Sequence, residues 1–209
     1  MSESLLQPFY RMVDALQANP HIEITDVEFK DPVSADDIAA TTKLAGGQFL
    51  DGMEEFYRET DGFRLEWRHD VAKVRKGDDR DTGAIDILPL RDVFASWQNM
   101  IWSDGPGSQR FKDLKPLDFF VPEACACVRH PDGQQLNPTI QYHQLGETVY
   151  DTGYSFKEYL DRLVASRGSW YWIETLCSAT RDSPQANDFL YRMPYLFEDF
   201  RPELFRPAT

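Results

Sequence analysis

Residues 49–69 read FLDGMEEFYRETDGFRLEWRH, and the spacing of their apolar side chains changes halfway along. The apolar residues before Gly62 recur at the spacing of one helix face, and they are Phe49, Met53, Phe56 and Tyr57. Those after Gly62 alternate with charged residues, as in a half-buried strand, and they are Phe63, Leu65 and Trp67. A glycine readily adopts the left-handed conformation that closes a helix. The stretch therefore predicts a helix that ends at Gly62 and a strand that follows it directly.

Patterns of the same two kinds extend to both sides of this stretch. Towards the N-terminus the sequence predicts a helix over residues 4–18, an extended segment over 22–29 and a short helix with Ser34 as its N-cap. Towards the C-terminus it predicts a strand over 84–88, which forms a hairpin with the first strand through a charged loop. A helix over 91–99 is expected to follow.

The second half of the chain alternates short strand patterns with turns. Runs of this kind fill residues 119–150, which is typical of an antiparallel meander. Ser155 and Glu158 form a capping box that opens a further amphipathic helix. Residues 183–209 are rich in aromatic side chains, so this tail must pack on its own domain or on a second chain.

The element order predicts the α+β class, as a single domain with a mainly antiparallel twisted sheet and helices packed on it. With 209 residues and 42% hydrophobic content the chain can bury the core of one such domain. We expect three parts. An N-terminal helical extension over residues 1–48 packs on an α+β core over 49–182, and the aromatic tail over 183–209 follows. A homo-oligomer formed through the tail stays an open alternative.

The composition leads us to expect a cytoplasmic protein that binds neither nucleic acid nor membrane. Lys and Arg number 22 and Asp and Glu 35, and the resulting formal charge of −13 repels phosphate backbones. No apolar run approaches the roughly 20 residues of a membrane span, and the first residues lack the pattern of a secretory signal. The three cysteines do not make a disulfide framework, in agreement with a reducing compartment. The acidic surface either attracts a basic partner or serves solubility alone.

Cys125 and Cys127 are the first candidates for chemistry, because strand alternation places both thiols on one face. His130 and His143 lie on neighbouring segments and could supply further metal ligands. Structural zinc sites, however, favour two or more residues between paired cysteines and usually hold two such pairs, whereas buried cysteines facing a core are common. We therefore expect packed thiols at this position, without a metal or another cofactor.

Other short motifs do not reach the patterns that known sites require. The acidic run of Asp78, Asp79 and Asp81 resembles a calcium loop, but arginine and threonine fall on two of its ligand positions, so a solvated hairpin loop is expected. Gly105 and Gly107 resemble the start of a phosphate-binding loop, yet the third glycine is missing and a proline removes an amide donor. The sequence contains no nucleophile elbow, paired-histidine zinc motif or P-loop.

Three groups of residues, in order along the chain, resemble motifs of the SUKH superfamily. The first is Met53-Glu-Glu-Phe-Tyr57 with Asp61-Gly-Phe63, which is similar to the family's helix and its Asn/Asp-Gly turn. The second is Gly83-x-Ile-x-Ile-Leu-Pro-Leu90 with Val93 and Trp97, which is similar to its strand and following helix. The third is Ser155-Phe-x-x-Tyr-Leu160, which is similar to its late helix. Together they span residues 49–164, whereas the turn at 129–133 and the tail differ from the family pattern.

The resemblance implies an α+β fold without catalytic residues and a function in binding another protein. The superfamily includes many immunity proteins of bacterial polymorphic toxin systems and a fungal regulator of cell-wall synthesis. For this chain it implies neutralisation of a cognate toxin, frequently a nuclease, to which an acidic inhibitor presents carboxylates in place of phosphates. The candidate contact residues, selected for their expected exposure, are Asp61, Glu66, Asp78, Asp79 and Asp81.

Two alternatives to an immunity protein remain open at this stage. The first is a regulatory adaptor of the same fold with a different partner. The second is a small enzyme whose site is dispersed in sequence, for which a pocket should bring His69, His130 or His143 together with carboxylates.

Overall fold

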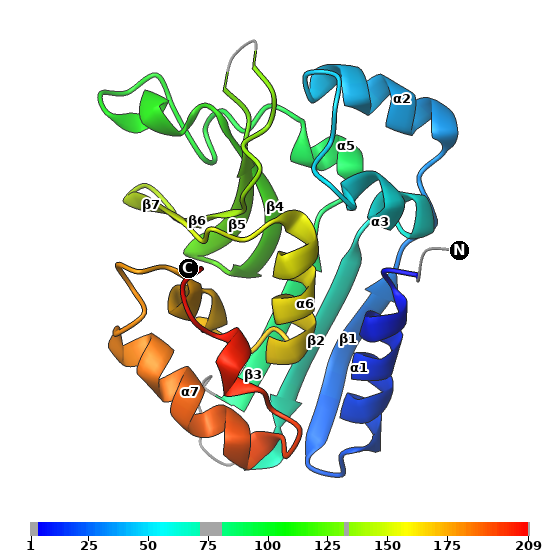
Figure 1. Ribbon diagram of the computed structural model, residues 1–209, viewed down its shortest axis with the longest axis vertical. Coiled ribbons are helices and arrows are strands. Elements are labelled where there is room, and N and C mark those ends of the chain that lie inside the picture. Colours follow the sequence, from blue (N-terminus) through cyan, green and yellow to red (C-terminus); the bar gives the residue numbers. More distant parts are fainter. Residues whose placement is uncertain (1–3, 72–80, 132–133, 209) are drawn as a thin grey trace.

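An antiparallel sheet of seven strands runs through the molecule, and its strand order follows the chain from β1 to β7 (Figure 1). The computed structural model describes residues 4–71, 81–131 and 134–208. The strands are β1 (Ile22–Phe29), β2 (Phe63–His69), β3 (Thr82–Ile87), β4 (Leu114–Val121), β5 (Ala124–Arg129), β6 (Gln141–Gln144) and β7 (Thr148–Asp151). Helices pack on this sheet within the same domain, so the predicted α+β class is confirmed.

Six α-helices and three 3₁₀ turns accompany the sheet in the described residues. The helices are α1 (Gln7–Ala18), α2 (Ala35–Leu44), α3 (Met53–Glu59), α5 (Leu90–Val93), α6 (Phe156–Ser166) and α7 (Pro184–Leu196). The 3₁₀ turns are η2 (Ser108–Phe111), η3 (Trp172–Leu176) and η4 (Pro202–Leu204). Figure 1 shows α1 and α6 side by side over one face of β1 to β3, with α2 and α3 at one end and α7 at the other. In the described part of the chain, no helix combines the length and the apolar character that crossing a bilayer requires.

The predicted succession of a helix and a strand is confirmed, but the prediction that Gly62 closes the helix is wrong, because the C-cap is Thr60 with an extended backbone. α3 ends at Glu59, and Gly62 has a φ of +103°, where an added Cβ would lie 2.4 Å from the carbonyl oxygen of Ile87. Both the left-handed backbone and this close approach require glycine. β2 then alternates buried and exposed side chains and pairs with β3, so that Phe63 lies opposite Ile87. The predicted hairpin is therefore confirmed for these strands, whereas most of its loop lies outside the described residues.

The prediction of a helix over residues 91–99 is wrong beyond the first turn. α5 comprises only Leu90–Val93, because the indole Nε1 of Trp97 donates to the carbonyl oxygens of Asp92 and Val93, at 3.0 and 3.3 Å. A longer helix would use these carbonyls for its own hydrogen bonds. Asn99 adopts a φ of +67°, which also turns the chain away from a helical path.

The aromatic tail packs against its own domain. α7 and the segment after it contribute to the same hydrophobic core as α1, α3 and the sheet, with Phe189, Met193, Phe197 and Phe205 buried. The ring of Phe197 meets that of Trp67 edge to face, at 5.6 Å between centroids. Residues 1–48 supply the edge strand β1 in addition to α1 and α2, so this segment forms part of the sheet itself.

A second, smaller core lies around β4 and β5. Its buried members are Ile101, Phe111, Leu114, Cys125 and Cys127. Ile101 and Phe111 come from the segment between α5 and β4, which covers these strands. The alternate residues Ala124, Ala126 and Val128 belong to the main core, so β5 is buried on both faces.

Candidate functional site

The three predicted contact carboxylates that the structure describes do not gather on one surface. Glu66 points outward from β2 and pairs with Arg64 at 2.7 Å, while Asp61 is half-buried and accepts a hydrogen bond from the Leu90 amide at 2.7 Å. The prediction that Asp81 is exposed is wrong. This residue is 4% exposed and forms an ion pair with Arg192 of α7, because the tail folds back over the start of β3. Asp78 and Asp79 lie outside the described residues.

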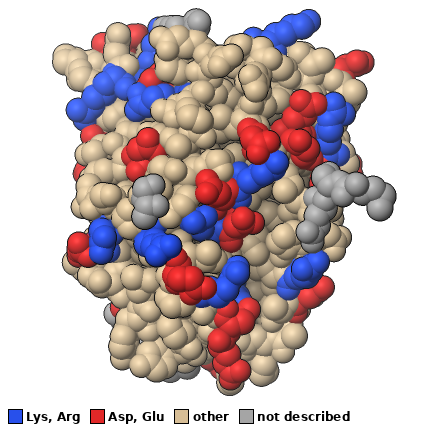
Figure 2. Space-filling model, in the orientation of Figure 1, with Lys and Arg blue, Asp and Glu red and all other residues tan. Residues whose placement is uncertain are grey.

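On the face drawn in Figure 2 the acidic side chains are spread out rather than gathered into one patch. Figure 2 shows acidic and basic side chains interspersed over the face that carries α1 and α6. Most of the net negative charge comes from the first 70 residues, where 15 acidic and 6 basic side chains give −9 of the total of −13. These residues build α1, β1, α2, α3 and β2.

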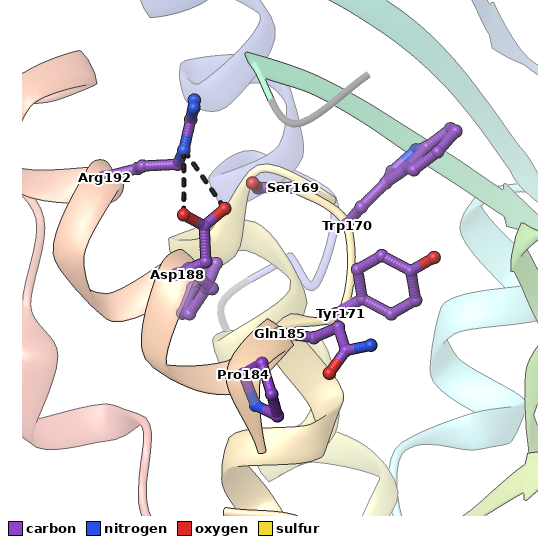
Figure 3. A pocket seen from close by; sticks show the side chains of 8 residues that line it. Ser169, Trp170, Tyr171, Pro184, Gln185, Asp188 and Arg192 are labelled. Atoms are coloured by element: carbon purple, nitrogen blue, oxygen red, sulfur yellow. Dashed lines mark hydrogen bonds and ion pairs between the residues drawn. The ribbon is translucent and has the colours of Figure 1, made fainter. Parts of the chain in front are cut away.

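A cleft with a volume of about 450 Å³ lies between the loop after α6 and the first turns of α7 (Figure 3). The loop contributes Ser169, Trp170 and Tyr171, and α7 contributes Pro184, Gln185, Asp188, Phe189 and Arg192. Trp170 and Tyr171 are half-buried, so each keeps part of its ring accessible. In Figure 3 these two rings lie on the side of the loop, and Asp188 with Arg192 lies on the side of α7. The cleft therefore combines aromatic surface with a charged wall.

The charged wall of the cleft is an ion cluster with a net negative charge. Arg192 pairs with Asp188 one turn earlier in α7, at 3.1 Å, and with Asp81 at the start of β3. One guanidinium against two carboxylates leaves a formal charge of −1. Since the side chain of Arg192 is only 15% exposed, these pairs occupy it and hold it against the protein. The cluster thus offers a carboxylate, rather than a free cation, to a ligand.

The loop side of the cleft is held in place by its backbone. Arg167, Gly168 and Tyr171 all have positive φ values, of 54°, 67° and 64°. The carbonyl of Gly168 accepts from the Ala84 amide at 2.9 Å, and an added Cβ on Gly168 would lie 2.5 Å from the Ala84 oxygen. The indole of Trp67 donates to the Arg167 carbonyl at 2.7 Å. Such strained, over-determined loops are common at functional sites.

A second group of side chains that could bind a ligand consists of Cys125, Cys127 and His143. Cys125 and Cys127 project from one face of β5, and His143 of β6 lies directly opposite Cys125 in the strand pairing. The two sulfur atoms are 3.4 Å apart, and the three possible ligand atoms all lie within 4.8 Å of one another. All three residues are fully buried. The predicted shared face of the two cysteines is confirmed, and of the two candidate histidines only His143 joins them.

His143 is buried without a hydrogen bond to either ring nitrogen. Burial, and then the charges of Arg129 and Arg110, lower its pKa to about 4, so the imidazole is neutral at physiological pH. The ring of Phe111 covers it at 4.6 Å between centroids. An unsatisfied buried polar group costs about 1–3 kcal/mol. Burial, followed by the hydrogen bond with Cys127, raises the pKa of the Cys125 thiol.

The remaining histidines lie elsewhere in the described part of the chain. His130 lines a cavity of about 320 Å³ with Lys112, Lys115 and aromatic side chains, and no carboxylate is among the described residues that line it. His69 and His21 flank Asp70, at 3.0 and 2.7 Å, on the surface near the ends of β1 and β2. The hydrogen bond from His21 is the largest cause of the lowered pKa of Asp70.

The comparisons with known proteins assign no family to this chain. No protein-family model matches it, and a search of the curated proteins finds no match either. The resemblance to the SUKH superfamily therefore stays a prediction from the sequence motifs, and the function must be argued from the chemistry of the sites.

Proposed function

We propose that this protein is a non-enzymatic binding module, and that it receives a cationic side chain of a basic protein partner in the Trp170 cleft. The observation that carries this proposal is the composition of the cleft, which is lined on one side by two half-buried aromatic residues and on the other by part of an ion cluster with a formal charge of −1. A cation over an aromatic face gains about 0.5–2 kcal/mol, and a carboxylate in reach adds a charge-assisted hydrogen bond.

The charge of the whole molecule supports a basic partner over an acidic or neutral one. The formal charge of −13 raises the rate at which a cationic protein meets this surface, particularly at low salt. Trp and Tyr are among the residues that dominate the binding energy of many protein interfaces, and the cleft contains both types. A partner with an exposed lysine or arginine would therefore be guided by the long-range field and anchored by the aromatic rings.

Within this class, we propose an immunity protein that neutralises a toxin, such as a nuclease, as the more specific function. This step depends on the SUKH-like motifs and on the basic surface that nucleases present to phosphate. A regulatory adaptor of the same fold would use the cleft in the same way. A growth assay separates the two: co-expression with the adjacent gene product should relieve its toxicity if the protein is an immunity protein, and an adaptor should show no such relief.

The cleft predicts a specific effect of Trp170→Ala on binding. The product of the adjacent gene is titrated into wild type and variant by isothermal titration calorimetry at low and at high salt. We expect Trp170→Ala to weaken binding about tenfold or more at both salt concentrations, because the aromatic anchor is lost. Asp188→Asn should weaken binding mainly at low salt, because it removes one charge from the cleft.

Trp102→Ala provides the matched control, since Trp102 is a partly buried tryptophan that lines the cavity around His130. This variant should bind the partner with an affinity within about twofold of the wild-type affinity. Equal affinities for wild type and Trp170→Ala, with both folded by circular dichroism, would show that this cleft is not the binding site. Absence of binding at low salt would count against the adjacent gene product as the partner.

A further inference from the structure

We propose that Cys125, Cys127 and His143 bind a thiophilic divalent metal ion, with Zn²⁺ as the physiological species. This inference is independent of the protein-binding function, because the three residues lie in the second core and none of them lines the Trp170 cleft. The sequence favours packed thiols, since a single Cys-x-Cys pair is a weak motif. The strand register provides the third donor, which local spacing does not show.

The donor atoms already lie near the separations that such an ion requires. Two sulfurs bound to Zn²⁺ at about 2.3 Å with a tetrahedral angle are roughly 3.8 Å apart. In the protein the sulfurs of Cys125 and Cys127 are 3.4 Å apart, and the His143 nitrogen lies within 4.8 Å of both. Small side-chain rotations would bring all three onto one ion, with no change in the pairing of β5 and β6.

The unpartnered imidazole of His143 is the second observation that points to a ligand. Fully buried polar side chains nearly always have a hydrogen-bond partner, yet both nitrogens of His143 lack one. An imidazole next to two thiols supplies the nitrogen and sulfur donors that Zn²⁺ binds. Among the described residues, this is also the one group of three His, Cys, Asp or Glu side chains whose ligand atoms converge.

The charge balance favours a divalent ion that prefers sulfur and nitrogen. Binding releases the two thiol protons, so the divalent ion and two thiolates form a neutral unit with the imidazole, which suits the apolar surroundings of Ile101, Phe111 and Leu114. Mg²⁺ and Ca²⁺ prefer oxygen donors and are therefore excluded by this donor set. Three protein donors leave one tetrahedral position for water or a small anion. Bound there, the ion would clamp β5 to β6 beneath the segment between α5 and β4.

The test measures metal content and cobalt spectra of the full-length protein. The protein is purified under a non-thiol reductant and without a metal-affinity column, and its zinc is measured by mass spectrometry. The metal is then removed with a chelator and Co²⁺ is added. We expect about one zinc per chain, and with Co²⁺ both a sulfur-to-metal charge-transfer band and the intense visible bands of four-coordinate cobalt. Adding Zn²⁺ to the metal-free protein should raise its melting temperature.

The variants separate a metal site from a packed core. Cys127→Ala and His143→Leu should each lose the bound metal and the cobalt bands. Cys177→Ala is the matched control, since Cys177 is an equally buried free cysteine on η3's C-terminal side, and it should keep both. The proposal is overturned if wild type holds no metal and takes up no Co²⁺, or if Cys125 and Cys127 form a disulfide that persists under the non-thiol reductant. It is also overturned if His143→Leu raises the melting temperature and Zn²⁺ has no effect, because the histidine would then be only an unsatisfied core residue.

Discussion

Replacing Arg192 by methionine is expected to lower the free energy of unfolding by about 3–5 kcal/mol. The guanidinium of Arg192 is the partner of Asp81, whose side chain is only 6% exposed. Methionine has a similar length but no charge, so the buried carboxylate of Asp81 would lose the counter-charge that the described residues give it. Removing one member of a buried pair is costly for this reason, even where the intact pair contributes little. Urea-induced unfolding at neutral pH, followed by circular dichroism, measures the effect.

Two further variants make this result specific to the buried pair. Arg181→Met removes an arginine that is 55% exposed and pairs with the exposed Asp182, so it should cost less than about 1 kcal/mol. The double variant Asp81→Leu/Arg192→Met removes both charges and should recover most of the lost stability, because an apolar pair can replace a buried ion pair. A loss for Arg192→Met no larger than that for Arg181→Met would contradict the burial of Asp81 beneath α7.

A second large effect is expected from pH, through Asp118 of β4. Its side chain is fully buried and accepts from the Asp86 amide at 2.7 Å and from the Tyr159 hydroxyl at 2.8 Å. Burial raises its pKa to about 7, and these two hydrogen bonds oppose the rise only in part. The carboxyl lies where β3 and β4 pair through Ile87 and Asp118, and it binds a backbone amide at this narrow contact.

The sign of the pH effect follows from the raised pKa. The folded protein keeps the Asp118 proton up to about pH 7, whereas the unfolded chain releases it near the ordinary value of 3.8. Between these values the folded state binds more protons, so stability falls as pH rises and is fully reduced above pH 7. A difference of about three pKa units corresponds to about 4 kcal/mol. Unfolding in urea at intervals from pH 4 to pH 8 measures it.

Asp118→Asn isolates this contribution from those of other groups. Asparagine keeps an acceptor for the Asp86 amide and stays neutral, so the variant should gain stability relative to wild type as pH rises, by up to about 4 kcal/mol at pH 8. Tyr159→Phe removes one hydrogen bond to the carboxylate and should move the decline to higher pH. The same Asp→Asn change at the exposed Asp14 serves as control. The prediction would be contradicted if the free energy of unfolding depended on pH in the same way for wild type and Asp118→Asn.

Local sequence patterns predicted much of the fold, because local interactions determine those elements. The alternation from Phe63 to Trp67 reflects burial of one strand face, and the capping box of Ser155 and Glu158 forms with both of its hydrogen bonds. The helix over 91–99 was predicted wrongly because the side chain of Trp97 competes for backbone carbonyls, which periodicity does not register.

The candidate sites were harder to predict, because they depend on contacts between distant segments. The cleft forms only when residues 168–169 pair with the start of β3 and α7 docks beside them. The same docking buries Asp81, which the sequence placed in an exposed loop. For the cysteines, alternation gave the shared face, but the position of His143 opposite Cys125 depends on the register of β5 and β6. A long connection between two strands leaves such a register undetermined in sequence.

Each strand of the sheet pairs with the one that precedes it in the chain, so the strands can assemble in the order in which the ribosome delivers them. The first hairpins nevertheless lack some of their final contacts until much later segments of the chain have been synthesised. The indole of Trp67 can form its hydrogen bond only after Arg167 has been synthesised. Asp81 can pair with Arg192 only after more than a hundred further residues have been added. Folding therefore includes a docking step in which residues 167–192 complete the contacts of Trp67 and Asp81, and a chain released before Arg192 is synthesised would lack the contact of Asp81.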